Sequence, residues 1–172
     1  MMKRALLIID LQNDYFTDGK FPLWNTDKTL ENIEKAVQQA INLDIEIIHI
    51  QHIADPAMGI APFFNETTEG VNIHPRIVAA APDAPVVVKR FADSFYKTTL
   101  EKTLYDLDVT ELLVCGMMTQ NCVTHTAISP AAEKYTVSIL ADCCTTVDEM
   151  IHKIALNAVS TRLQLSSLEQ LN

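Results

Sequence analysis

The stretch Ala5-Leu6-Leu7-Ile8-Ile9-Asp10 decides the fold class, because five consecutive apolar residues end abruptly at a carboxylate. A short continuous apolar run is typical of a strand that is covered on both faces of a parallel sheet. Comparable runs recur along the chain, at residues 45–50, 86–88, 112–115, 137–140 and 163–165. Helical patterns separate these runs. The alternation predicts a three-layer α/β sandwich, Rossmann-like, with a parallel sheet of about six strands.

Three of the intervening helices have recognisable starting points. An apolar stripe at helical spacing over residues 30–41 follows Thr26, which we expect to cap that helix. Thr98 and Thr146 each stand three residues before a glutamate and ahead of another apolar stripe. This spacing is the pattern of a capping box and predicts two further helix starts.

The helix expected after the fourth apolar run places a cysteine in its first turn, where a thiol is more reactive. Thr119 is expected to cap a helix that begins near Gln120, so Cys122 falls in its first turn. Unpaired N–H groups and the positive end of a helix lower a thiol pKa, which favours a reactive cysteine over a buried structural one. Pro130 lies inside this expected helix and should kink it, because proline removes one backbone hydrogen bond.

Length and charge limit the classes of partner. At about 150 residues per domain, 172 residues predict one domain spanning residues 1–172. Apolar residues make up 48% and charged residues 20%, as in ordinary globular proteins. The formal net charge is −9, and such an acidic surface repels phosphate groups. We therefore expect no nucleic-acid partner and, without a polybasic stretch, no membrane partner.

The N-terminus and the cysteines indicate a reduced, cytoplasmic protein. The apolar run after Lys3-Arg4 meets Asp10 too early for a signal peptide, which needs about 7–15 apolar residues. No stretch approaches the roughly 20 apolar residues of a membrane span. The four cysteines lack the CxxC spacing of a zinc or redox site: Cys115, Cys122, Cys143 and Cys144.

Polar side chains follow several of the expected strands. Asp10, His52 and Lys89 come after the first, second and third apolar runs, and Cys122 comes shortly after the fourth. Ligands of open parallel sheets bind outside the carboxyl ends of the strands, so these side chains should converge. Taken singly, Asp10 could be a capping residue or a metal ligand, and Lys89 a surface lysine. An acid, a cation and a thiol together predict a chemical site.

The walls of this site are expected to be aromatic. Residues 53–85 hold five of the seven prolines and form a long loop, which is usually functional or disordered in a compact domain. Most of the few aromatic residues lie in loops near the proposed site. The predicted substrate pocket comprises Phe16, Trp24, His52, Phe64, Phe95 and Tyr96.

Three motifs in this order carry a family resemblance across nearly the whole chain. They read Leu6-Leu7-Ile8-Ile9-Asp10-Leu11-Gln12-Asn13-Asp14-Tyr15-Phe16, then Lys89-Arg90-Phe91-Ala92-Asp93-Ser94-Phe95, then Cys115-Gly116-Met117-Met118-Thr119-Gln120-Asn121-Cys122-Val123. The sequence resembles the isochorismatase-like cysteine hydrolases, the superfamily of nicotinamidases and N-carbamoylsarcosine amidohydrolase. The resemblance implies the strand order 3-2-1-4-5-6 and a homodimer or homotetramer.

The same resemblance implies roles for individual residues. Asp10, Lys89 and Cys122 would form a catalytic triad that attacks a small-molecule amide. A cis peptide bond would join Met117 to Met118, and the backbone N–H groups of Met118 and Cys122 would form the oxyanion hole. The thioester on Cys122 would then be hydrolysed by water.

Departures from the family pattern refine these expectations. Nicotinamidases carry an Asp-x-His metal motif where this chain reads Ile50-Gln51-His52, so we expect no metal and no other cofactor. Isochorismatases that cleave a vinyl ether lack the nucleophilic cysteine, and Cys122 therefore favours C–N hydrolysis. Two alternatives stay open: a vinyl-ether hydrolase and a non-catalytic small-molecule binding protein on the same scaffold.

Overall fold

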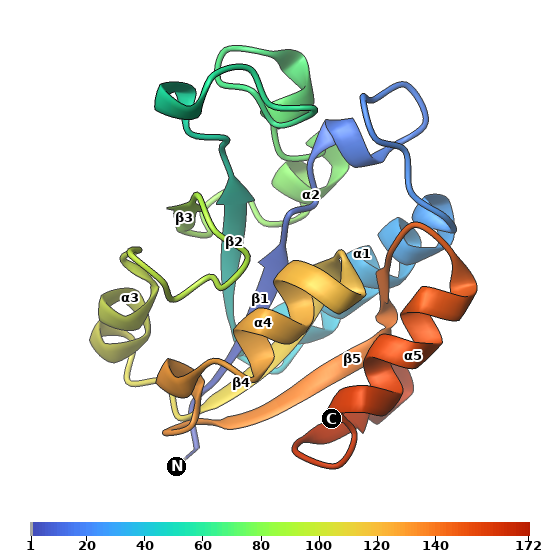
Figure 1. Cartoon of the computed structure of the whole chain (residues 1–172). Helices are drawn as coiled ribbons and strands as arrows, with labels where there is room; N and C mark the ends of the chain where they lie inside the picture. Colours follow the sequence, from blue (N-terminus) through green and yellow to red (C-terminus); the bar gives the residue numbers. More distant parts are fainter. Residues whose placement is uncertain (1) are drawn as a thin grey trace.

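The computed structural model describes residues 2–172 and has a six-stranded, wholly parallel sheet at its centre (Figure 1). The strand order is β3-β2-β1-β4-β5-β6, which confirms the predicted fold class and order. The strands are β1 (Arg4–Ile9), β2 (Glu46–His52), β3 (Val86–Lys89), β4 (Glu111–Met117), β5 (Thr136–Thr145) and β6 (Gln164–Ser166).

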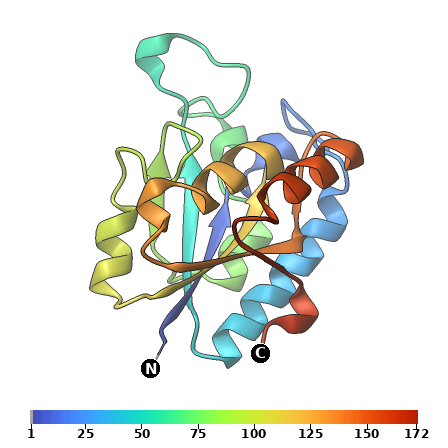
Figure 2. The same ribbon diagram turned by 60° about the horizontal axis from the view of Figure 1, so that its bottom comes forward.

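Helices cover both faces of this sheet. The α-helices are α1 (Thr26–Asn42), α2 (Pro75–Ala80), α3 (Leu100–Asp106), α4 (Thr124–Ala127) and α5 (Glu149–Val159). Right-handed crossovers place α1 and α2 on one face, because the chain moves from β1 outward to β3. The chain then returns to β4 and moves outward to β6, so the later helices lie on the opposite face (Figures 1 and 2). No helix among residues 2–172 combines the length and apolarity that crossing a membrane requires.

Burial explains why the strand patterns differ between the centre and the edge. β1 pairs with β2 on one side and β4 on the other, and its residues from Ala5 to Ile9 are at most 1% exposed. A strand covered on both faces has no need of alternation, so its sequence is continuously apolar. At the edge, β3 alternates: Val86 and Val88 are exposed, whereas Val87 and Lys89 are buried.

Two of the expected helix caps are wrong by one residue. α1 begins at Thr26, and its N-cap is Asn25 in the left-handed conformation, without a side-chain cap. Asparagine tolerates that conformation better than threonine, because its short polar side chain can bond locally. α3 begins at Leu100 after Thr99, and the Thr98 hydroxyl accepts the Leu100 N–H at 3.2 Å.

The third cap is wrong for a different reason. The Thr146 hydroxyl is buried and donates to Gln120 Oε1 at 2.6 Å, which holds it away from the start of α5. Asp148 caps that helix instead, and its Oδ1 accepts the Ile151 N–H at 2.9 Å. Tertiary contacts therefore choose among several residues that could each serve as a cap.

Pro130 does not kink a helix. α4 ends at Ala127, and a separate 3₁₀ turn, Pro130–Ala132, follows with Ser129 as its N-cap. Proline fits the first position of such a turn, because the N–H that it lacks would have no partner there. The expected long helix after Cys122 is therefore two short elements.

Gly116 is the glycine on which the sheet depends most directly. It lies in β4 with φ +122°, and a Cβ there would stand 2.1 Å from the backbone oxygen of Ile9. The pairing of β4 with β5 shifts register between Val114 and Gly116. β4 therefore passes the end of β1 at a distance that only glycine allows.

We predict that Gly116→Ala lowers the free energy of unfolding by about 3 kcal/mol or more, because left-handed strain adds to a clash with backbone. Gly59→Ala is the matched control: its φ is +86°, but no atom lies within 4 Å of its Cβ position. That variant should lose only about 1–2 kcal/mol. Urea denaturation measures both, and equal losses would contradict the clash.

Candidate active site

The Lys89 ammonium is the centre of the site. Its Nζ atom lies 3.1 Å from Asp10 Oδ2 and 3.1 Å from Cys122 Sγ. It also lies 3.0 Å from His52 Nδ1 and 3.0 Å from the backbone oxygen of Phe91. The structure thus brings together the acid, the cation and the thiol that the sequence places after separate strands.

The sheet positions the two charged members. Lys89 ends β3 and pairs in register with His52 at the end of β2. Asp10 follows β1 in the left-handed conformation (φ 55°), and its N–H donates to Ile50 O at 3.0 Å. Aspartate is among the few non-glycine residues that adopt this conformation readily. Because the strands are parallel neighbours, their carboxyl ends deliver the side chains to one place.

Cys122 reaches the site from the turn after β4. The segment Thr119–Val123 is a π-helical turn with Met118 as its N-cap, and α4 begins only at Thr124. The prediction of an α-helix that begins near Gln120 is therefore wrong, because a π-helical turn stands there instead. The Met117–Met118 peptide bond is cis, at the predicted position. Cys122 is 2% exposed.

Burial dominates the electrostatics of the thiol. Desolvation raises the pKa of Cys122, the Asp10 carboxylate raises it further, and Lys89 opposes both. The expectation that a helix start would lower this pKa is wrong, because the site is nearly dry and a carboxylate faces the sulfur. At rest, Cys122 is a protonated thiol.

Lys89 nevertheless keeps its charge. Burial opposes the charged form, but Asp10 and Cys122 together outweigh it and raise the pKa of Lys89 above its usual range. For His52, burial and the Lys89 charge lower the pKa to about 4 despite Asp10. The site therefore holds an ammonium ion beside a neutral imidazole.

Asp10 is buried with unused capacity to accept hydrogen bonds. Its side chain is fully buried; Oδ2 contacts Lys89 Nζ at 3.1 Å, and Oδ1 has no hydrogen-bond donor among residues 2–172. The ion pair with Lys89 compensates its charge at short distance. An unsatisfied buried carboxylate oxygen is costly, so Oδ1 is available to accept a hydrogen bond from a molecule that enters the site.

The site combines candidate metal ligands with a competing cation. Ligand atoms of Asp10, His52 and Cys122 lie within 4.8 Å of one another, close enough in distance alone to share an ion. However, Lys89 Nζ already contacts Asp10 and Cys122 at 3.1 Å and His52 at 3.0 Å. A divalent cation among these atoms would face the ammonium at close range in a poorly screened interior.

A small cavity opens beside the thiol. Its volume is about 180 Å³, and its lining consists of Tyr15, His52, Ala54, Ala61, Pro62, Phe63, Phe64, Asn121 and Cys122. Two of the predicted pocket residues, His52 and Phe64, are among them. The Phe64 N–H donates to Asp14 Oδ2 at 2.7 Å, which holds this aromatic wall in a left-handed conformation (φ 61°).

The other four predicted pocket residues lie elsewhere: Phe16, Trp24, Phe95 and Tyr96. Phe16 lines a separate cavity, and Tyr96 is half-exposed. Trp24 and Phe95 pack toward the rings of His152 and Tyr135, respectively. These side chains fill small apolar clusters under the loops, a use that composition cannot distinguish from a pocket wall.

Sequence reasoning missed several residues of the cavity. Tyr15 stands in the same motif as Asp10, and Asn121 directly precedes Cys122, so proximity to the proposed triad was an available signal. Ala61, Pro62 and Phe63 come from the long loop after β2. Nothing in their pattern indicates which part of that loop returns to the sheet.

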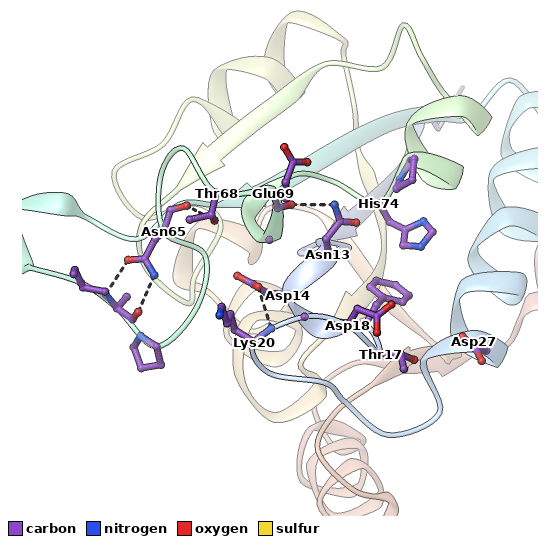
Figure 3. A pocket seen from close by; sticks show the side chains of 17 residues that line it. Asn13, Asp14, Thr17, Asp18, Lys20, Asp27, Asn65, Thr68, Glu69 and His74 are labelled. Atoms are coloured by element: carbon purple, nitrogen blue, oxygen red, sulfur yellow. Dashed lines mark hydrogen bonds between the residues drawn. The ribbon is translucent and has the colours of Figure 1, made fainter.

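A second, larger cavity lies away from the thiol. It measures about 900 Å³ and lies between the loop after β1 and the loop after β2 (Figure 3). Asp14, Asp18 and Glu69 are among the residues that line it. Ala61 and Pro62 line both cavities and so form the wall between them. Chemistry rather than volume identifies the smaller cavity as the candidate active site.

The fold and the site define a hydrolase of the three-layer α/β class. The chain belongs to the isochorismatase family, because the family model described as the isochorismatase domain matches residues 4–169.

Individual relatives agree with this assignment. The isochorismatase family protein YddQ of Bacillus subtilis is 39% identical over 145 residues, which cover 84% of this chain and 79% of the relative. A maleamate amidohydrolase of Pseudomonas putida is 27% identical over 158 residues, covering 82% of this chain and 71% of that protein. The crystal structure of an isochorismatase family protein from Desulfovibrio vulgaris has the same fold, with a TM-score of 0.89. It is 22% identical, and the match covers 99% of this chain and 97% of that one.

We predict that acid destabilises the protein partly through His52. Its pKa is about 4 when folded and about 6.5 when unfolded, so between these values the unfolded state binds the extra proton. The free energy of unfolding should therefore fall as the pH drops from 6.5 to 4, with up to about 3 kcal/mol attributable to this residue. Denaturant titrations of the wild type and His52→Asn at several pH values measure the difference. Identical pH slopes in the two proteins would refute it.

Proposed function

We propose that this protein hydrolyses the C–N bond of a small amide or carbamoyl compound through a thioester on Cys122, without a metal. One observation carries the proposal: Lys89 Nζ lies 3.1 Å from both Asp10 Oδ2 and Cys122 Sγ in a nearly dry site. An acid–base group, a fixed positive charge and a nucleophile at mutual reach are what acyl transfer requires.

The raised pKa of Cys122 dictates how the attack begins. The thiol is protonated at rest, so its proton moves to Asp10 as the S–C bond to the substrate carbonyl forms. Lys89 stays cationic and stabilises the developing thiolate. A carboxylate oxygen of Asp10 lies within 4.8 Å of the Cys122 sulfur, and Oδ1 has no hydrogen-bond donor in the described part of the chain.

Backbone N–H groups would stabilise the tetrahedral oxyanion. Met118 lies between β4 and the π-helical turn, and its N–H has no acceptor within residues 2–172. Together with the Cys122 N–H it would supply two donors for the oxyanion. A donor of this kind contributes roughly 3 kcal/mol to transition-state stabilisation.

Asp10 then acts first as a general acid and afterwards as a general base. Its proton passes to the leaving nitrogen as the C–N bond breaks, which releases ammonia or an amine and leaves the thioester. A water molecule loses a proton to Asp10 and attacks the thioester carbonyl. The C–S bond breaks, the proton returns to the sulfur, and the products are a carboxylic acid and the free thiol.

The amidohydrolase among the relatives supports C–N chemistry, and the position of Lys89 supports catalysis without a metal. The nucleophilic position of Cys122 favours an acyl intermediate over the vinyl-ether cleavage of other family members. The cavity of about 180 Å³ falls below the range of about 300–1,000 Å³ that accommodates drug-sized ligands, so we propose a small substrate.

We predict that the wild type releases ammonia from small primary amides and that Cys122→Ala loses at least about 10³-fold in kcat, because the nucleophile is gone. A coupled ammonia assay over amides, ureides and carbamates measures this, and mass spectrometry should detect an acyl adduct on Cys122 during turnover. Activity should persist after dialysis against a chelator.

Three outcomes would count against the proposal. Undiminished turnover by Cys122→Ala would point to chemistry without a thioester, as in vinyl-ether cleavage. Tight ligand binding without turnover of any amide would indicate a binding protein. Activity that disappears with the chelator and returns with added metal would exclude the metal-free mechanism. A thermal unfolding midpoint close to that of the wild type shows that the variant is folded.

A further inference from the structure

The proton on the His52 ring can be placed from its neighbours. Lys89 Nζ lies 3.0 Å from His52 Nδ1, and an ammonium group can only donate hydrogen bonds. Because Lys89 keeps its charge, Nδ1 accepts, and the single proton of the neutral imidazole resides on Nε2. His52 is therefore a fixed donor through Nε2–H.

This donor group belongs to a residue that lines the cavity beside the thiol. His52 lines the cavity, and its Nε2 atom has no hydrogen-bond partner within the described part of the chain. The atom is not completely enclosed by protein, as contact with a molecule in the cavity requires. Nothing in the protein itself uses this N–H.

Tyr15 supplies a second unused donor. It lines the same cavity at 1% exposure, and its hydroxyl likewise has no partner among residues 2–172. Burial raises the pKa of Tyr15, and the Asp10 carboxylate raises it further, so the hydroxyl stays protonated. The ring packs edge-on against Phe64 with centroids 4.6 Å apart, which fixes its position.

The rest of the lining offers no positive charge. Apart from the Asn121 amide and the thiol, the other lining residues are alanine, proline and phenylalanine. The nearby Lys89 has three N–H bonds and already faces four acceptors: Asp10, Cys122, His52 and the Phe91 carbonyl. It has no free N–H for a substrate carboxylate.

From this arrangement we infer, given the proposed amide hydrolysis, that the acyl part of the substrate is small and uncharged. It carries an oxygen acceptor beyond the scissile carbonyl, which Tyr15 and His52 bind. A carboxylate in this position would lose its hydration without gaining a cationic partner, and that exchange is unfavourable. Neutral donors on a mostly apolar wall instead match a ketone, ester, ether or second amide oxygen.

Three primary amides of similar size test the inference. 4-Oxopentanamide is uncharged and has the second acceptor, pentanamide lacks it, and succinamate replaces it with a carboxylate. We expect kcat/KM for 4-oxopentanamide to exceed that for pentanamide about tenfold, through KM, as for one uncharged hydrogen bond. Succinamate should be poorer than 4-oxopentanamide by about 10²-fold.

Variants assign the effect to the two donors. Tyr15→Phe removes only the hydroxyl, and His52→Asn keeps an acceptor for Lys89 but removes the N–H that faces the cavity. Each should lower the ratio of kcat/KM between 4-oxopentanamide and pentanamide about threefold, because the two donors share the tenfold preference. Tyr105→Phe is the matched control, because it removes a hydroxyl from an exposed tyrosine on α3 and should leave the ratio unchanged.

The outcomes separate this inference from the proposed function. A preference for succinamate, or a ratio that neither Tyr15→Phe nor His52→Asn changes, overturns the inference and leaves amide hydrolysis standing. Hydrolysis of other primary amides without turnover of these three also overturns the inference and leaves amide hydrolysis standing. Absence of ammonia release from every amide overturns the proposed function itself.

Discussion

The buried ammonium of Lys89 is the constraint on which the site depends. A charge at 1% exposure costs several kcal/mol to desolvate, so it must be surrounded by acceptors that the fold delivers with accuracy. Asp10, His52 and Cys122 come from the ends of β1, β2 and β4, and Lys89 itself ends β3. The order β3-β2-β1-β4 puts these four ends side by side. The ion cluster therefore ties four of the six strands together at the carboxyl edge of the sheet.

A second buried carboxylate, that of Asp14, supports the aromatic wall of the cavity beside the thiol. Asp14 Oδ1 accepts the Lys20 N–H at 3.1 Å, and Oδ2 accepts the Phe64 N–H at 2.7 Å. Gly70 packs so closely that a Cβ there would stand 2.0 Å from Asp14. The aromatic wall thus rests on hydrogen bonds to Asp14 rather than on its own helix or strand, and Ala61 and Pro62 line both this cavity and the larger one.

Sequence alone predicted the parts of this protein that local pattern determines. Continuous apolar runs mark β1 and β4, and the polar residue after each strand marks the site, because strand ends and site coincide in parallel sheets. Helix starts were less predictable, since Thr146 was drawn into a tertiary hydrogen bond with Gln120. The thiol pKa was predicted in the wrong direction because burial beside Asp10, which no local pattern encodes, outweighs the position of Cys122 in its turn.

The charge state of the whole site follows from the same burial. Asp10 and Lys89 neutralise each other, the thiol keeps its proton, and Tyr15 and His52 are neutral, so the cavity has no net charge in a protein of formal charge −9. An acidic surface would repel anionic ligands at long range, and a neutral cavity would not compensate them at short range. Shape and hydrogen-bond geometry, rather than charge, are then the means by which this site distinguishes one small molecule from another.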